Sequence, residues 1–128
     1  MSKPKNVKID LLHLYSEAHK CYLAYENTRS ANAYGRYLEF RRLFSELNVS
    51  KDYVSYVFGA KRNIAKGRKI CSSDLIERAA FLYDYNKQIS DPTIEGRYDA
   101  LVGIMLDCGL AESYFEYRER SVAYAKKD

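Results

Sequence analysis

Apolar residues return at helical spacing along almost the whole chain, and this pattern constrains the fold more than any other feature. Between Val7 and Thr28 they recur every three or four residues for about five turns, which is the period of an amphipathic helix. No segment alternates strictly between apolar and polar residues with turn signals on both sides, so we expect no β-sheet. The pattern predicts an all-α fold.

Capping and turn residues divide this pattern into five or six helices. Ser50 is a suitable N-cap, and Asp91-Pro92 marks another start because proline fits the first helical position. Gly59 and Gly109 end the helices that precede them. The expected helices span about residues 7–28, 31–47, 50–58, 74–88, 92–108 and 111–126.

The chain has 128 residues, enough to bury a core but too few for two domains of ordinary size. With 47% hydrophobic residues and only 2 Pro and 6 Gly, it does not have the composition of a disordered chain. No repeat with a period of 20–50 residues is evident at the level of whole helices. We therefore expect one compact helical bundle over residues 1–128, with a flexible N-terminus over residues 1–6.

The sequence lacks the features of secreted and membrane proteins. No stretch approaches the ~20 apolar residues of a membrane span, and no apolar run of a signal peptide follows the charged start. Cys21, Cys71 and Cys108 are too few and too widely spaced for a disulfide framework or a metal knuckle. We expect a cytoplasmic protein with free thiols and no membrane partner.

Nothing in the sequence favours an enzyme, a metal or a cofactor. His13 and His19 are six residues apart and point in different directions on a helix, so they do not suit a shared metal ion. The cysteines lie in apolar surroundings, where a thiol usually fills the core. The sequence has no phosphate-binding glycine loop, paired-carboxylate motif or nucleophile elbow, so we expect no catalytic residues.

Charge is distributed unevenly, although the net charge is only +4. From Ser50 to Lys69 six cations face a single acid, Asp52, whereas from Ser90 to Glu119 seven acids face two arginines. The basic segment includes a predicted loop, where its side chains are free to meet phosphate groups. The alternative is that each segment is only a solvated face of the protein.

The segment from Phe40 to Gly59 fits the apolar pattern of a helix-turn-helix. This motif places apolar side chains at its fourth, eighth, tenth, fifteenth and eighteenth positions, where they clamp the two helices together. Asn48 takes the turn position, which favours a left-handed residue. The alternative is a helical corner in an ordinary bundle. The five predicted clamp residues are Leu43, Leu47, Val49, Val54 and Val57.

A second, degenerate frame covers residues 101–120, with Gly109 as its turn glycine. Its last clamp position is occupied by Arg118, and its second helix carries three glutamates that a phosphate backbone would repel. We expect this second hairpin to pack on the protein or on a partner. Its four apolar clamp residues are Ile104, Cys108, Leu110 and Phe115.

These segments resemble known transcription regulators. The stretch LFSELNVSKDYVSYVF (43–58) resembles the first helix-turn-helix of the AraC-type regulators, and CGLAESYFEYRER (108–120) resembles their second. Glu77-Arg78-Ala79 is similar to the linker helix of that family. The first segment is also similar to the single helix-turn-helix of Cro/repressor proteins, because Gly59, Lys61, Arg62 and Asn63 follow it.

The resemblance implies a sequence-specific transcriptional regulator that places helix 50–58 in the major groove of double-stranded DNA. Such a module is usually a homodimer, and helix 7–28 is long enough to supply the contact. Phosphate contacts position a protein without reading sequence, whereas side chains on the helix meet the bases. The implied base-facing residues are Lys51, Asp52, Ser55 and Tyr56. The implied phosphate contacts are Lys61, Arg62, Lys66, Arg68 and Lys69.

The alternative function is a small helical protein that binds another protein and no DNA, such as a phage- or plasmid-encoded adaptor or inhibitor. The chain has 13 tyrosines, and tyrosine is enriched in the centres of protein interfaces. Tyrosine rings also fill cores with their hydroxyls directed to water. We expect most of the rings to lie in the core, and Tyr56 and Tyr117 to be the two with another role.

Overall fold

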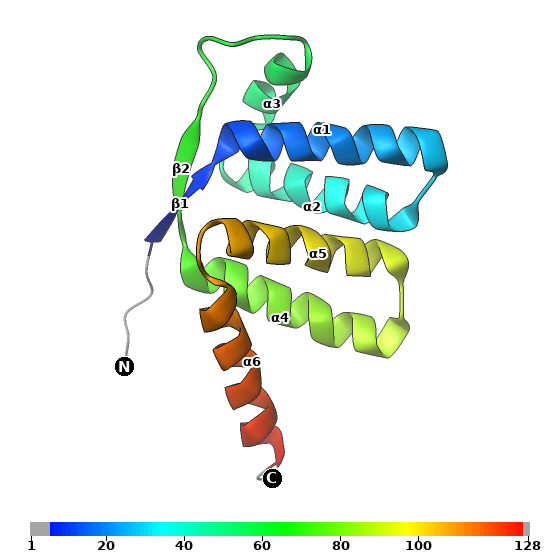
Figure 1. Ribbon diagram of the computed structural model, residues 1–128, viewed down its shortest axis with the longest axis vertical. Helices are drawn as coiled ribbons and strands as arrows, with labels where there is room; N and C mark the ends of the chain where they lie inside the picture. Colours follow the sequence, from blue (N-terminus) through cyan, green and yellow to red (C-terminus); the bar gives the residue numbers. More distant parts are fainter. Residues whose placement is uncertain (1–5, 127–128) are drawn as a thin grey trace.

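The fold consists of two copies of one unit, a strand followed by three helices (Figure 1). The computed structural model describes residues 6–126, and the side chains of residues 6–120. The first unit comprises β1 (Asn6–Asp10), α1 (Leu11–Thr28), α2 (Ala31–Glu46) and α3 (Ser50–Val57). The second unit comprises β2 (Gly67–Cys71), α4 (Ser72–Ile89), α5 (Pro92–Asp107) and α6 (Ala111–Lys126).

The two units match residue by residue with a constant offset of 61 positions. β2, α4 and α5 each begin and end 61 residues after β1, α1 and α2. The turns match too, because left-handed residues follow both α1 and α4 (Arg29 and Ser90) and precede both α3 and α6 (Asn48 and Gly109). In the sequence the match appears as a few identical positions, among them Lys-Ile at 8–9 and 69–70, Gly-Arg-Tyr at 35–37 and 96–98, and Tyr-x-x-Tyr at 53–56 and 114–117. The period is longer than the 20–50 residues in which no repeat was evident.

β1 and β2 pair as an antiparallel two-stranded sheet, so the expectation of no sheet is wrong. Lys8 lies opposite Lys69 at the centre of the register, and the matched Ile9 and Ile70 are both buried. Each strand has five residues, too few to show a clear alternation, and its partner is distant in sequence. Asn6 pairs with Cys71, while the rest of the expected flexible N-terminus, residues 1–5, lies outside the described residues.

The helices confirm the compact helical fold. α1 begins at Leu11 rather than at residue 7, because the preceding residues pair in β1 and the Asp10 side chain accepts a hydrogen bond from the His13 backbone N–H (3.3 Å). α4 begins at Ser72, two residues before the expected start, since β2 leads directly into it. The other helices lie within two residues of their expected bounds.

α2 and α5 cross at two matched glycines, where the backbones of the two units come together. A Cβ atom on Gly35 would lie 1.9 Å from the carbonyl oxygen of Thr93, and one on Gly96 would lie 2.1 Å from that of Asn32. Because Asn32 and Thr93 are themselves matched, the contact is reciprocal, like the interface of a two-fold symmetric dimer. The Asn32 side chain also donates to Asp99 on α5 (2.9 Å).

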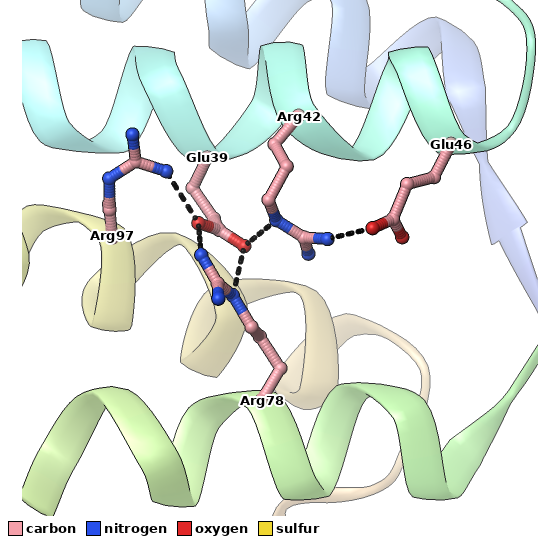
Figure 2. Close-up of polar contacts among 5 residues, drawn as sticks. All are labelled: Glu39, Arg42, Glu46, Arg78 and Arg97. Atoms are coloured by element: carbon pink, nitrogen blue, oxygen red, sulfur yellow. Dashed lines mark hydrogen bonds and ion pairs between the residues drawn. The ribbon is translucent and has the colours of Figure 1, made fainter.

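One buried carboxylate connects α2, α4 and α5 (Figure 2). Glu39 on α2 has no exposed surface, yet its oxygens accept hydrogen bonds from Arg42 (2.7 Å), Arg78 of α4 (3.2 and 3.3 Å) and Arg97 of α5 (3.1 Å). Arg42 also donates to Glu46 (2.6 Å). Burial by itself raises the pKa of Glu39, but the hydrogen bonds and positive charges of Arg78 and Arg42 outweigh it, so the pKa is lowered.

Gly35→Ala and Gly96→Ala should each lower the free energy of unfolding by at least about 2 kcal/mol, because the new methyl group would overlap a backbone carbonyl that has no room to move. Gly103→Ala is the matched control, since it lies in the same helix as Gly96 with open space around it. We expect it to stabilise the protein by about 0.5–1 kcal/mol. Urea titrations measure all three, and equal effects at Gly96 and Gly103 would contradict the crossing.

Glu39→Gln should cost about 3–5 kcal/mol, because it leaves three half-buried guanidinium groups without their carboxylate. A lowered folded-state pKa contributes stability at pH values above the unfolded pKa, and this contribution is lost as the pH falls through the folded pKa. The variant should therefore lose less stability than the wild type between neutral pH and acid. Unfolding titrations at a series of acidic pH values measure this, and parallel curves for the two proteins would refute the role of Glu39.

Candidate nucleic-acid interface

The turn between α2 and α3 forms where expected, but α3 presents a different face to the core. Asn48 has a φ of 60°, which confirms the left-handed turn. Of the predicted clamp residues, Leu43 and Val49 are buried and Leu47 is half-buried. Val54 and Val57 are exposed, which corrects the expected clamp. Their place is taken by Tyr53, whose ring is buried 5.2 Å from that of Phe44.

The second hairpin shows the same one-residue shift. Ile104 and Leu110 are buried as expected, but Phe115 is about half exposed. The residue before it, Tyr114, is buried instead, and its hydroxyl donates to that of Tyr98 (3.1 Å). In both units a tyrosine therefore occupies the core position that the frame assigned to the next residue.

The exposed face of α3, which we call the α3 face, consists of Lys51, Val54, Ser55 and Phe58. These residues follow the three- and four-residue spacing of one helix face, and all are exposed, with Phe58 at 86%. Two of the predicted base-facing residues, Lys51 and Ser55, thus point outward from α3.

Asp52 and Tyr56, the other two predicted base-facing residues, turn inward. The Asp52 carboxylate accepts a hydrogen bond from the Ala65 backbone N–H (2.9 Å). The Tyr56 ring lies 5.5 Å from that of Tyr15 and is half-buried, so it supports the core instead of facing outward. Tyr117, which matches Tyr56 in α6, is exposed.

The loop from α3 to β2 is anchored to the protein at Ala65. Its carbonyl oxygen accepts a hydrogen bond from the Tyr15 hydroxyl (2.9 Å), and the Leu11 N–H donates to the carbonyl oxygen of Lys66 (3.0 Å). Burial, together with a smaller contribution from the charge of Asp52, raises the pKa of Tyr15 to about 12, so this hydroxyl stays protonated at neutral pH. The loop thus has a fixed position beside α3 at one end of the molecule (Figure 1).

The predicted phosphate contacts are exposed and carry unneutralised charge. Lys61, Arg62, Lys66 and Arg68 all lie in or next to the loop, and all are exposed. Among residues 6–120, neither these four nor Lys51 and Lys69 form an ion pair. Arg68 donates to the carbonyl oxygen of Gly67 (3.1 Å).

Lys69 lies apart from α3. It lines a groove of about 770 Å³ between α2 and α4, together with Arg42, Glu46, Asp74 and Glu77. The structure therefore brings Lys51, Ser55 and the loop cations to one end of the molecule, but not Lys69.

The histidines and cysteines have structural surroundings. His13 lies 3.2 Å from the Asp107 carboxylate, and Cys21 is buried, which raises the pKa of its thiol. Cys71 and Cys108 are half-buried free thiols. No cluster of three or more potential metal-binding side chains occurs in the described part of the chain. Within residues 6–126, no helix combines the length and the apolar character of a membrane span.

The duplication accounts for more than half of the tyrosines. Eight of the 13 tyrosines form four matched pairs. In the second unit the rings of Tyr83, Tyr98 and Tyr114 are in successive contact. In the first unit Arg41 lies over the rings of both Tyr37 and Tyr53. In the first unit, Tyr22 packs 5.2 Å from Tyr37 beside a groove of about 240 Å³, which Arg41 and Phe58 also line. In the second unit, Arg118 stacks 3.6 Å over the matched Tyr83.

No family model, curated protein or solved structure matches this chain. The resemblance to AraC-type and Cro/repressor regulators thus stays a prediction.

Proposed function

We propose that the protein binds double-stranded DNA with the end formed by α3 and the loop before β2, as a transcriptional regulator would. The observation that supports this is the set of exposed cations in residues 51–68 without an acidic partner. The nearby acid, Asp52, is engaged by the Ala65 N–H. Several cations held on one fixed surface repel one another, and this repulsion opposes folding when no anion is bound. The phosphate backbone of DNA would neutralise these charges.

The contacts would be mainly to phosphate. Lys61, Arg62 and Lys66 project from the anchored loop, whereas only Lys51 and Ser55 on the α3 face offer polar groups to base edges. Val54 and Phe58 on the same face can touch a thymine methyl group but form no hydrogen bonds. Binding should thus depend steeply on salt and discriminate modestly between sequences.

The triple variant Lys61→Ala/Arg62→Ala/Lys66→Ala should bind duplex DNA more weakly and reduce the slope of log affinity against log salt by about 2–3, because each lost phosphate contact removes about 0.9 from the slope. Fluorescence anisotropy with a random-sequence duplex over a range of salt concentrations measures this. Lys20→Ala/Lys87→Ala/Arg120→Ala is the control, since it removes the same charge at exposed positions elsewhere. Equal losses in the two triple variants would contradict the assigned interface.

A second candidate function, self-association, is favoured by the faces of α3 and α6. The residues matched to the α3 face are Glu112, Phe115, Glu116 and Glu119, all exposed, which we call the α6 face. One face is basic and apolar and the other is acidic and apolar, so they are complementary between two copies. The two helices lie at opposite ends of the molecule, so this contact would join copies head to tail (Figure 1).

Self-association predicts that the average mass of the wild type rises above 14.9 kDa with concentration in light scattering. Phe58→Glu and Phe115→Lys should each remain monomeric, because each places a repelling charge on one face. An equal mixture of the two variants should form a dimer, since each retains the face that the other lacks. A mixture that stays monomeric excludes this contact. Phe115→Lys should leave DNA affinity unchanged, which separates the two candidate functions.

A further inference from the structure

The cluster formed by Glu39, Arg42, Arg78 and Arg97 joins α2 to α4 and α5, and the duplication gives it a matched site where α5 meets α1 and α2. That matched site is a cavity of about 300 Å³. Ala100 stands at the position that matches Glu39, and Gly103 at the one that matches Arg42. Small residues thus replace a carboxylate and a guanidinium group, and the space that those side chains fill in one unit is open in the other.

Arg36 is the matched residue of Arg97 and lines this cavity. Arg97 donates to Glu39 at 3.1 Å. Arg36 forms no ion pair among the side chains of residues 6–120, and its Nε is buried without an acceptor. A buried donor without a partner costs about 1–3 kcal/mol. At the matched position, Arg97 donates its hydrogen bond to a carboxylate, that of Glu39. The duplication thus indicates that a carboxylate is the suitable partner for Arg36.

The rest of the lining determines what else the ligand must carry. Glu17 replaces the matched Arg78, and Asp99 and Asp107 lie on the α5 side, so a simple anion would be repelled. These three carboxylates already have partners, in Lys20 (3.7 Å), Asn32 (2.9 Å) and His13 (3.2 Å) respectively. Of these three partners, Asn32 is an uncharged amide, and Lys20 and His13 are exposed to solvent.

The remaining wall is apolar. Leu14, Phe40 and Ile104 are buried side chains that line the cavity, and Leu106 lies exposed at its edge. A protein cavity of about 150 Å³ is large enough to hold benzene. The cavity of about 300 Å³ therefore accommodates a ligand with a branched aliphatic side chain and two small charged groups. The site therefore combines one guanidinium group, a set of carboxylates and an apolar floor, as sites for small ligands commonly do.

We propose that this cavity binds a small apolar α-amino acid in its zwitterionic form. The ligand carboxylate takes the place of the Glu39 carboxylate and accepts hydrogen bonds from Arg36. The ammonium group lies against Glu17 and Asp99, and the side chain packs on Leu14, Phe40 and Ile104. This proposal is independent of DNA binding and of self-association, because none of these residues belongs to the α3 face, the α6 face or the loop.

Isothermal titration of the full-length protein with L-leucine tests the proposal, with 4-methylpentanoate and 3-methylbutylamine as analogues that each lack one charged group. We expect leucine to bind at millimolar concentration or below, and each analogue to bind at least about tenfold more weakly. Absence of leucine binding overturns the proposal. An analogue that binds as tightly as leucine also overturns it, because the zwitterion would then not be recognised.

Variants locate the site. Arg36→Met should abolish leucine binding without unfolding the protein, since Arg36 takes part in no ion pair. Arg29→Met is the matched control, because Arg29 is an exposed arginine outside the cavity, and it should bind like the wild type. Ala100→Glu should also abolish binding, because it supplies the cavity with its own carboxylate. Equal affinity of Arg36→Met and the control overturns the proposal, whatever the stability of Ala100→Glu.

Discussion

The carboxylate of Glu39 is the interaction on which the arrangement of the helices depends. An ionised carboxylate without exposed surface is tolerated only when cations and hydrogen bonds replace the water that it has lost. Here the replacement comes from α2 itself, from α4 and from α5, so the charge is satisfied only when elements from both units are in place. The reciprocal glycine crossing brings the backbones of α2 and α5 close enough for Arg97 to reach it.

The two units share a backbone but have diverged in charge and in the use of equivalent sites. The first unit carries the cations of the loop and of the α3 face, whereas the second carries acids on α6. At the centre, Glu39 closes one site, and Ala100 leaves its counterpart open beside Arg36. A duplicated fold thus allows one copy of a site to serve stability while the other is free to bind a ligand.

Local patterns predicted most of the helices and their ends. Asp91 caps α5 and Asn48 forms a left-handed turn as expected, because caps and left-handed turns depend on a few neighbouring residues. Ser50 was expected to cap α3, but Val49 holds the N-cap position without a side-chain hydrogen bond, and Ser50 is the first residue of the helix. The strands were missed, because β1 and β2 exist only by pairing with each other and neither has enough residues for a visible alternation.

The clamp at Val54 was wrong because the frame does not allow for a tyrosine one position earlier. The inward positions of Asp52 and Tyr56 could not be predicted without the loop that they support. The roles of Arg36 and Glu39 could not be predicted either, because they depend on contacts between helices that are distant in sequence.

The antiparallel sheet has a consequence for how the chain is made. Its two strands belong to different units, so β1 cannot pair until all of β2, up to Cys71, has emerged from the ribosome. Likewise, α2 cannot pack against α5 until most of the second unit has been synthesised. Contacts between such distant segments form slowly, and unpaired strands and apolar helix faces are exposed to aggregation in the interval. The first unit therefore stays incompletely folded during most of the synthesis of the second unit. This is the stage at which the nascent chain most needs protection from aggregation.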